Sequence, residues 1–108
     1  MNQQPDGLTP VRLGKITTVV THLEMTRKPD LRPAHEPAGV TVVQHGDPDV
    51  VWYRDLYRRV GGHDWLWFSR LILDDAALKA EICADGVEVF SVRLDGKDVG
   101  LLELDFSD

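Results

Sequence analysis

Two short stretches of the sequence contain the residues best suited to bind or act on a small molecule. The first is WLWFSR, in which Trp65, Trp67 and Phe68 precede a hydroxyl and a guanidinium at Ser69 and Arg70. Aromatic side chains provide rigid, amphipathic contact area, so these three suit the wall of a substrate groove with the two polar residues at its rim. The alternative interpretation is a hydrophobic plug that joins neighbouring helices to a sheet.

The second stretch is ELD near the end of the chain. Glu103 and Asp105 share one face of a predicted strand, while Leu102, Leu104 and Phe106 share the opposite face. One interpretation is a solvated sheet face. The other is that Glu103 holds or deprotonates a substrate ammonium, directly or through water, because an amine must lose its proton before it attacks an acyl carbonyl.

Other site chemistries find little support in the sequence. The histidines lack zinc-ligand spacing, and a single cysteine, Cys83, can form neither an internal disulfide nor a metal cluster. We therefore predict no metal site, and we expect Cys83 to be a small buried side chain inside a helix. RRVGG at 58–62 has the glycines of a phosphate loop, but they follow a predicted helix instead of preceding one, which favours a helix end.

Composition and charge narrow the class of protein. The 108 residues suit one domain, and 43% hydrophobic with 28% charged residues is the balance of a soluble globular protein. The 18 acidic residues against 12 basic ones give a net charge of −6, which disfavours nucleic acid and mildly favours a cationic partner such as an amine. With no apolar run of roughly 18–20 residues and no signal-like start, we expect a cytoplasmic protein without a membrane partner.

The first half of the chain is predicted to contain one clear strand. Residues 1–13 are polar and contain prolines and glycine, which is typical of a flexible leader. KITTVVTHLEM at 15–25 is rich in β-branched residues and predicts a strand. A proline-rich loop follows, and VTVVQHG at 40–46 reads as a short strand or a strand-like arm.

The second half predicts two helices and a hairpin. The first helix has Asp47 as its N-cap and Pro48 at its first position, and it ends at the two glycines before His63. The second helix begins near Asp74 and ends before Gly86. Two strands then meet at an Asp-Gly turn, and the first is apolar on both faces, as expected of a central strand. The fold class is therefore α+β (α/β), a mostly antiparallel sheet with two helices.

Three segments resemble the N-terminal half of the GNAT superfamily of acyl-CoA-dependent N-acetyltransferases: VVTHLEMT, WYRDLYRRVGGHDWLWFSR and VEVFSVRLDGKDVGLLELDF. The resemblance identifies residues 14–108 as a partial GNAT-like domain, the N-terminal half of the acyl-CoA N-acyltransferase fold. It implies a first strand, two helices with an intervening substrate loop, and then a hairpin of the second and third strands. It also implies acetyl transfer from acetyl-CoA to a small-molecule or peptide amine, with residues 65–70 in the substrate loop and Glu103 on the third strand.

The family pattern continues beyond these elements into a fourth strand and a helix. The loop between them, Q/R-x-x-G-x-G/A, holds the pyrophosphate of acetyl-CoA. This motif does not occur here, so no cofactor-binding residue carries over, and we expect the chain alone neither to bind acetyl-CoA tightly nor to turn it over. We expect its last strand to pair with a homodimer partner or a complementary C-terminal half. A non-enzymatic interaction module that associates through this strand is the main alternative, and a small ligand-binding protein that uses the tryptophans is another.

Overall fold

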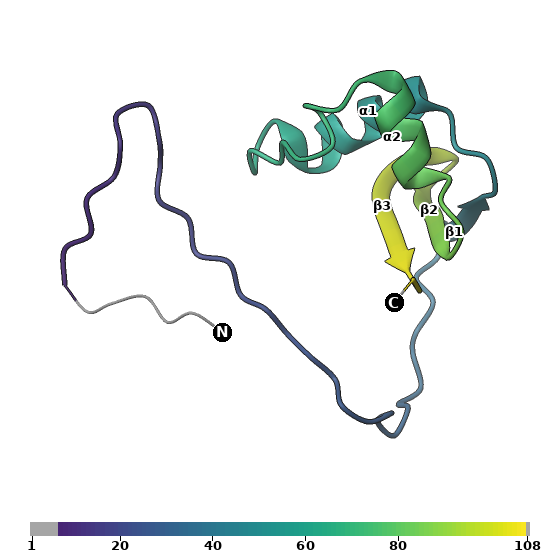
Figure 1. Ribbon diagram of the computed structural model, residues 1–108. Coiled ribbons are helices and arrows are strands. Elements are labelled where there is room, and N and C mark those ends of the chain that lie inside the picture. Colours follow the sequence, from purple (N-terminus) through teal and green to yellow (C-terminus); the bar gives the residue numbers. More distant parts are fainter. Residues whose placement is uncertain (1–6, 108) are drawn as a thin grey trace. The chain divides into compact units, whose positions relative to one another are not determined.

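The chain divides into two units that are described separately. The computed structural model describes residues 7–107, and its two units are Met1–Pro33 and Ala34–Asp108 (Figure 1). The predicted leader falls in the first unit, and its first six residues lie outside the described residues.

The first unit contains no strand among its described residues. The strand predicted at 15–25 is therefore wrong, and the β-branched side chains of this segment, such as Val19, are exposed. β-branched residues favour a strand where a neighbouring strand and a packed face receive them, and residues 7–33 of this unit contain neither. Composition alone could not supply that partner.

The second unit contains all the described regular structure. Its elements are, in order, β1 (Val40–His45), α1 (Val50–Tyr57), the π-helical turn η1 (Arg58–Gly62), α2 (Asp75–Ile82), β2 (Val87–Leu94) and β3 (Lys97–Asp105). The three strands form one antiparallel sheet in the order β1-β2-β3. This confirms the predicted α+β arrangement, and it places the first strand in the segment that the sequence offered as a strand or an arm.

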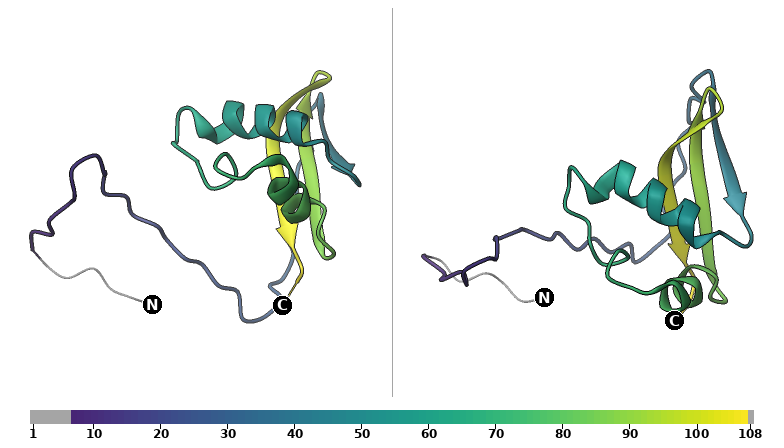
Figure 2. Two further views of the ribbon diagram at one scale, coloured as in Figure 1. Left: turned by 45° about the horizontal axis from the view of Figure 1, so that its top comes forward. Right: turned by 90° about the horizontal axis from the view of Figure 1, so that it is seen from above.

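Both helices lie against the same face of the sheet, as the two views in Figure 2 show. In the strand register, Val89 of β2 is paired with His45 on one side and Glu103 on the other, so these three residues share the face that the helices cover. Leu102 and Leu104 of β3 alternate with Glu103 and lie on the opposite face, where both are exposed. The covered face thus carries the Glu103 carboxylate, while Leu102 and Leu104 of β3 lie on the opposite face together with Glu88 of β2.

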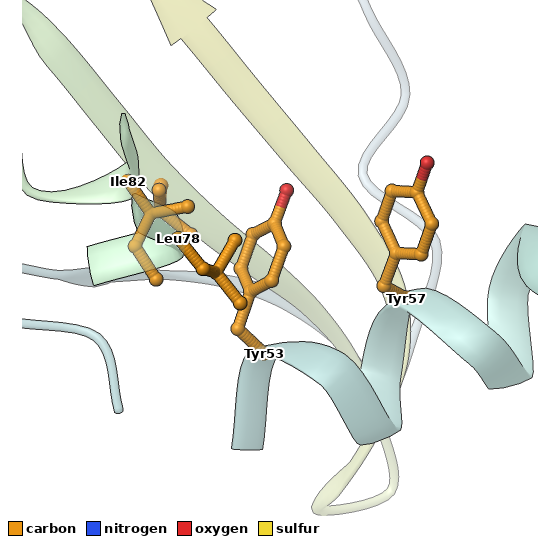
Figure 3. Close-up of a cluster of buried hydrophobic side chains, with 5 residues drawn as sticks. Tyr53, Tyr57, Leu78 and Ile82 are labelled. Atoms are coloured by element: carbon orange, nitrogen blue, oxygen red, sulfur yellow. The ribbon is translucent and has the colours of Figure 1, made fainter. Parts of the chain in front are cut away.

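The core lies between the helices and β2 because each helix presents its apolar residues at helical spacing. Tyr53 and Tyr57 project from the same side of α1 (Figure 3), and they form one buried cluster with Leu78 and Ile82 of α2. These four side chains and Val89 are buried. Complete burial of an aliphatic side chain such as Leu78 contributes about 1.5–3 kcal/mol, so this small cluster stabilises the packing of the helices on the sheet.

Local capping differs from the sequence prediction in α1 and agrees with it in α2. The N-cap of α1 is Asp49, whose Oδ2 accepts a hydrogen bond from the Trp52 amide at 3.0 Å. Asp47, the predicted cap, instead pairs with Lys79 at 2.9 Å, so the assignment of Asp47 and Pro48 to the helix start is wrong by two residues. Asp74 caps α2 as predicted, because its Oδ1 accepts from the Ala77 amide at 2.7 Å.

The ends of the two helices and the hairpin turn can each be compared with the sequence prediction. The first helix continues through η1, where the His63 amide donates to the Arg58 carbonyl at 3.1 Å, before the chain turns into the loop. Asp95 and Gly96 both have positive φ, at 50° and 80°, which matches the expected two-residue hairpin turn. Cys83 is not buried inside a helix as predicted: it caps the end of α2 and is exposed.

Candidate functional site

Glu103 contacts two residues that lie far from it in the sequence. The Tyr53 hydroxyl donates to Glu103 Oε1 at 2.7 Å, and Arg70 Nη2 donates to Glu103 Oε2 at 2.5 Å. Tyr53 comes from α1, and Arg70 comes from the loop between η1 and α2. The Glu103 side chain is only 22% exposed, so the interpretation of a solvated sheet face is wrong for this residue. Asp105, on the same face, is exposed.

Arg70 also joins this cluster to the second helix. Its Nη1 donates to Glu81 Oε2 of α2 at 2.9 Å, so one guanidinium spans two carboxylates. Desolvation lowers the pKa of Arg70, but the hydrogen bond to Glu81 and the charge of Glu103 outweigh it, and its pKa lies above the ordinary value. Burial, followed by the hydrogen bond to Glu103, raises the pKa of the Tyr53 phenol. We call Tyr53, Arg70, Glu81 and Glu103 the carboxylate cluster.

The carboxylate cluster leaves Glu103 able to accept further donors. An ionised carboxylate has about four lone-pair sites, and Tyr53 and Arg70 occupy one site on each oxygen. An ammonium or a water molecule can therefore still donate to Glu103 where its side chain is exposed. The geometry is compatible with binding of a cationic group beside the loop.

The segment between η1 and α2, residues 63–73, carries the predicted aromatic residues, and we call it the aromatic loop. Trp65 is 75% exposed, Phe68 is 66% exposed and Trp67 is 46% exposed. Trp65 and Phe68 therefore do not form the buried plug that was the alternative interpretation. Trp67 is the most covered of the three, and its ring centroid lies 5.7 Å from that of Tyr57.

Several contacts fix the backbone of the aromatic loop. The Gly61 carbonyl accepts hydrogen bonds from the amides of Trp65 at 3.0 Å and Trp67 at 3.2 Å. The Trp67 ring lies so close to Gly61 that a Cβ there would be 2.0 Å from its nearest ring carbon. The Ser69 hydroxyl is 3.2 Å from that of Tyr57. Ser69 thus anchors the loop to α1, and Arg70 anchors it to Glu81 and Glu103.

A second polar cluster links the strands to α1 on the covered face. The His45 Nε2 lies 2.8 Å from the hydroxyl of the fully buried Ser91, and the imidazole packs on Trp52 at a centroid distance of 4.1 Å. The Trp52 indole donates to Asp98 Oδ2 at 3.0 Å, and Arg93 donates to Asp98 Oδ1 at 2.8 Å. The hydrogen bond from Trp52, followed by that from Arg93, lowers the pKa of Asp98 to about 2. Because Ser91 is inaccessible, we interpret this cluster as structural.

Sequence reasoning identified Glu103 and Arg70 separately but missed their partners Tyr53 and Glu81. In the sequence, Tyr53 stood out only as one of the apolar residues at helical spacing in the first helix. Its hydroxyl is hydrogen-bonded to Glu103, which lies 50 positions away in the sequence. Tyr53 and Tyr57 are four residues apart and therefore lie on the same buried face of the helix. This spacing is the only feature of the sequence that indicates that the Tyr53 hydroxyl could reach the sheet. Glu81 gives no comparable signal.

The described pockets lie away from the aromatic loop. One is lined by residues 44–46 and 82–88 at the end of β1, and another by residues 35–37 and the start of β1. Within residues 7–107, no group of three histidine, cysteine or acidic side chains is placed to hold a metal ion. In the same residues, no helix has the length and apolarity needed to cross a bilayer.

Comparisons of this chain with protein-family models, with curated proteins and with solved structures found no match. The carboxylate cluster and the aromatic loop are therefore interpreted from their own contacts and exposure.

Proposed function

We propose that this chain forms the acceptor side of a GNAT-family N-acetyltransferase, which moves an acetyl group from acetyl-CoA to a small-molecule or peptide amine. The observation that carries the proposal is the order β1, α1, α2, β2, β3 in one antiparallel sheet, with Arg70 of the intervening loop in contact with Glu103 of β3. The GNAT resemblance implies this order for the N-terminal half of the acyl-CoA N-acyltransferase fold. In this proposal β1 at Val40–His45 is the first strand, because the VVTHLEMT segment of the resemblance forms no strand.

Each residue of the site has a distinct proposed role. Glu103 accepts a hydrogen bond or a proton from the substrate ammonium, directly or through water. Tyr53 and Arg70 hold its carboxylate in place through the two short hydrogen bonds. Trp65, Trp67 and Phe68 contact the organic part of the acceptor, and Ser69 and Arg70 fix the loop that presents them. Only Glu103 would act on the reacting nitrogen.

The chemistry of the complete reaction is a direct displacement. The neutral amine nitrogen forms a bond to the thioester carbonyl carbon, the carbon–sulfur bond breaks, and the proton lost by the amine balances the proton gained by the thiolate. Alignment of the two reactants would supply much of the rate. The part played by this chain is to hold the acceptor and to receive the ammonium proton.

The described residues do not fit the pyrophosphate of acetyl-CoA. The N-termini of α1 and α2 are the places where backbone amides could bind a phosphate, but the carboxylates of Asp49 and Asp74 already accept from those amides. Gly61 and Gly62 close a helix and do not open one. The proposal therefore assigns no step on acetyl-CoA to this chain. We also propose that the activity is cytoplasmic.

Two measurements test the proposal. In calorimetry, the 108-residue chain alone should show no micromolar binding of acetyl-CoA, and such binding would refute its assignment to the acceptor side. The full translation product of the gene is then assayed for transfer of labelled acetyl groups to a panel of amines. Loss of transfer in Glu103→Gln, with transfer retained in Glu88→Gln, is the expected result because Glu88 also lies in the sheet but on the face opposite Glu103. Absence of transfer to every amine would contradict the acetyltransferase assignment.

A second candidate function is an interaction module that associates through β3. Within residues 7–107, β3 pairs only with β2, and its residues Leu102 and Leu104 are exposed on the face without helices. An edge strand with one free edge and an apolar face is a template for pairing with another chain. Sedimentation of the purified chain separates the candidates: a dimer whose stability falls with Leu102→Lys supports this function, and a monomer at high concentration counts against it.

A further inference from the structure

We propose that the acceptor is a cationic amine carried on an apolar body, and that the aromatic loop binds this body on its exposed side chains. This inference rests on the proposed function and names the class of substrate for the same site. It begins from the exposure of four apolar residues of the loop to water: Trp65, Leu66, Phe68 and Ile72. Folded chains seldom expose apolar residues in such close succession unless a partner covers them.

The loop does not need these exposed side chains for its own conformation. Its backbone is held by the Gly61 carbonyl, by Trp67 packed on Gly61, by the contact of Ser69 with Tyr57 and by the two carboxylates on Arg70. An ordered loop with apolar side chains in water loses little further entropy when a ligand covers them. Preorganised surfaces of this kind bind better than mobile ones.

The charges around the loop favour a cation over an anion. Arg70 carries one positive charge between two carboxylates, those of Glu81 and Glu103, so this group has an excess of negative charge. Arg59 pairs with Asp55 at 2.9 Å and adds no net charge. Exposed Asp64 lies with its Oδ1 3.1 Å from His63 Nδ1, and Arg58 is also exposed. The faces of exposed tryptophans then supply the remaining selectivity, because an ammonium is attracted to an aromatic face and an anion is not. The net charge of −6 adds a weak attraction in the same direction.

The test uses three small probes on the full chain without acetyl-CoA. Phenethylamine combines a cation with an apolar ring, 2-phenylethanol keeps the ring without the charge, and ethylamine keeps the charge without the ring. Chemical shifts of the backbone amides and of the tryptophan indoles report binding at the loop. Phenethylamine should give saturable shifts at residues 63–73 with a Kd of about 1–10 mM, as expected for about nine non-hydrogen atoms on an open surface. The other two probes should bind at least about threefold more weakly.

Matched variants decide whether the loop is the binding surface. Trp65→Ala and Phe68→Ala should each weaken phenethylamine binding at least about threefold. Phe106→Ala is the control, because Phe106 is 66% exposed, as is Phe68, but lies after β3. These residues are exposed, so the variants should fold, and retention of the remaining amide spectrum checks this.

Several outcomes would overturn the inference. They are equal binding of the three probes, no binding of phenethylamine at 50 mM (about five times the expected upper Kd), an equal effect of Phe106→Ala, or loop shifts that arise with phosphatidylglycerol vesicles and not with the amine. Binding of phenethylamine by a protein that never transfers acetyl groups would remove the proposed function and keep this binding site. Acetyl transfer only to small polar amines would keep the function and remove the inference.

Discussion

Replacement of Gly61 by alanine tests whether the backbone beneath Trp67 fixes the aromatic loop. A Cβ at this position would lie 2.0 Å from Trp67 Cε3 and 2.1 Å from Cδ2. Non-bonded carbons prefer separations of about 3.5–4.0 Å, so the ring must move by roughly 1.5 Å or more. Gly61 does not have a positive φ, so the backbone itself accepts alanine and the close approach alone explains the glycine.

The expected loss of stability follows from the area that Trp67 covers. This side chain is 46% exposed, so about half of it is covered. Half of the roughly 150–250 Å² of a tryptophan is about 100 Å², and its exposure costs about 2.5 kcal/mol at 25 cal/mol per Å². Alanine in place of glycine in a helical turn returns about 0.5–1 kcal/mol. The clash therefore outweighs the propensity, and we expect Gly61→Ala to lower the free energy of unfolding by about 1.5–2 kcal/mol.

Urea denaturation gives the free energy of unfolding, and the indole cross-peaks in NMR show whether Trp67 has left its position beside Tyr57. The control is Gly46→Ala, since a Cβ at Gly46 meets no atom within 4 Å and should change stability by less than about 0.5 kcal/mol. In a Trp67→Ala background the sign should reverse, because only the helix propensity remains. The reasoning is refuted if Gly61→Ala is as stable as the parent and its Trp67 indole peak does not move.

Three further predictions concern the core and two titrating groups. Leu78→Ala should lower the free energy of unfolding by about 2–5 kcal/mol in urea denaturation, whereas exposed Leu31→Ala should change it by less than about 0.5 kcal/mol. The pKa of Asp98 is about 2 in the folded chain and about 3.9 in the unfolded chain. The ionised Asp98 side chain therefore stabilises the folded chain above pH 4, and this contribution is lost as the pH falls towards 2. Asp98→Asn should flatten that part of the pH–stability profile. The pKa of Tyr53 is raised, so ultraviolet titration should find this phenol protonated beyond pH 10, with stability falling as alkali ionises it in the unfolded chain; ionisation near pH 10 would contradict the burial argument.

The elements predicted correctly are those specified by short-range signals. Asp74 caps α2 through an amide three residues away, and the turn at Asp95 and Gly96 needs only two residues with positive φ. The prediction of Asp47 as the cap of α1 failed because the local pattern does not distinguish it from Asp49, which also precedes the helix. The difference depends on Lys79 of α2, which pairs with Asp47.

The predictions that failed depend on partners that the local sequence does not contain. The β-branched segment at 15–25 has the composition of a strand, but hydrogen bonding in a sheet requires a second strand in register. Cys83 was expected to be a small buried side chain inside a helix, yet α2 ends at Ile82, one residue earlier. Burial at a helix end depends on the tertiary packing, which a periodic pattern does not show.

The candidate site was predictable only in part, for the same reason. Alternation along β3 separated Glu103 from its apolar neighbours, and the cluster of aromatic residues marked the loop. The pairing of Glu103 with Tyr53 and Arg70 spans 50 and 33 positions, and no spacing rule reaches that far. What the structure adds is the conclusion that the Glu103 carboxylate faces the helices, while the rings of Trp65 and Phe68 face water.

The site joins two groups of residues that respond differently to substitution. Tyr53 fills the core and also donates to Glu103, so its loss would change stability and the position of the carboxylate together. Trp65 and Phe68 contribute little to the core because they are exposed. An effect of Tyr53 on acceptor binding would therefore have to be corrected for unfolding, whereas an effect of Trp65 or Phe68 would not. The exposed half of the aromatic loop is thus where binding can be measured apart from folding.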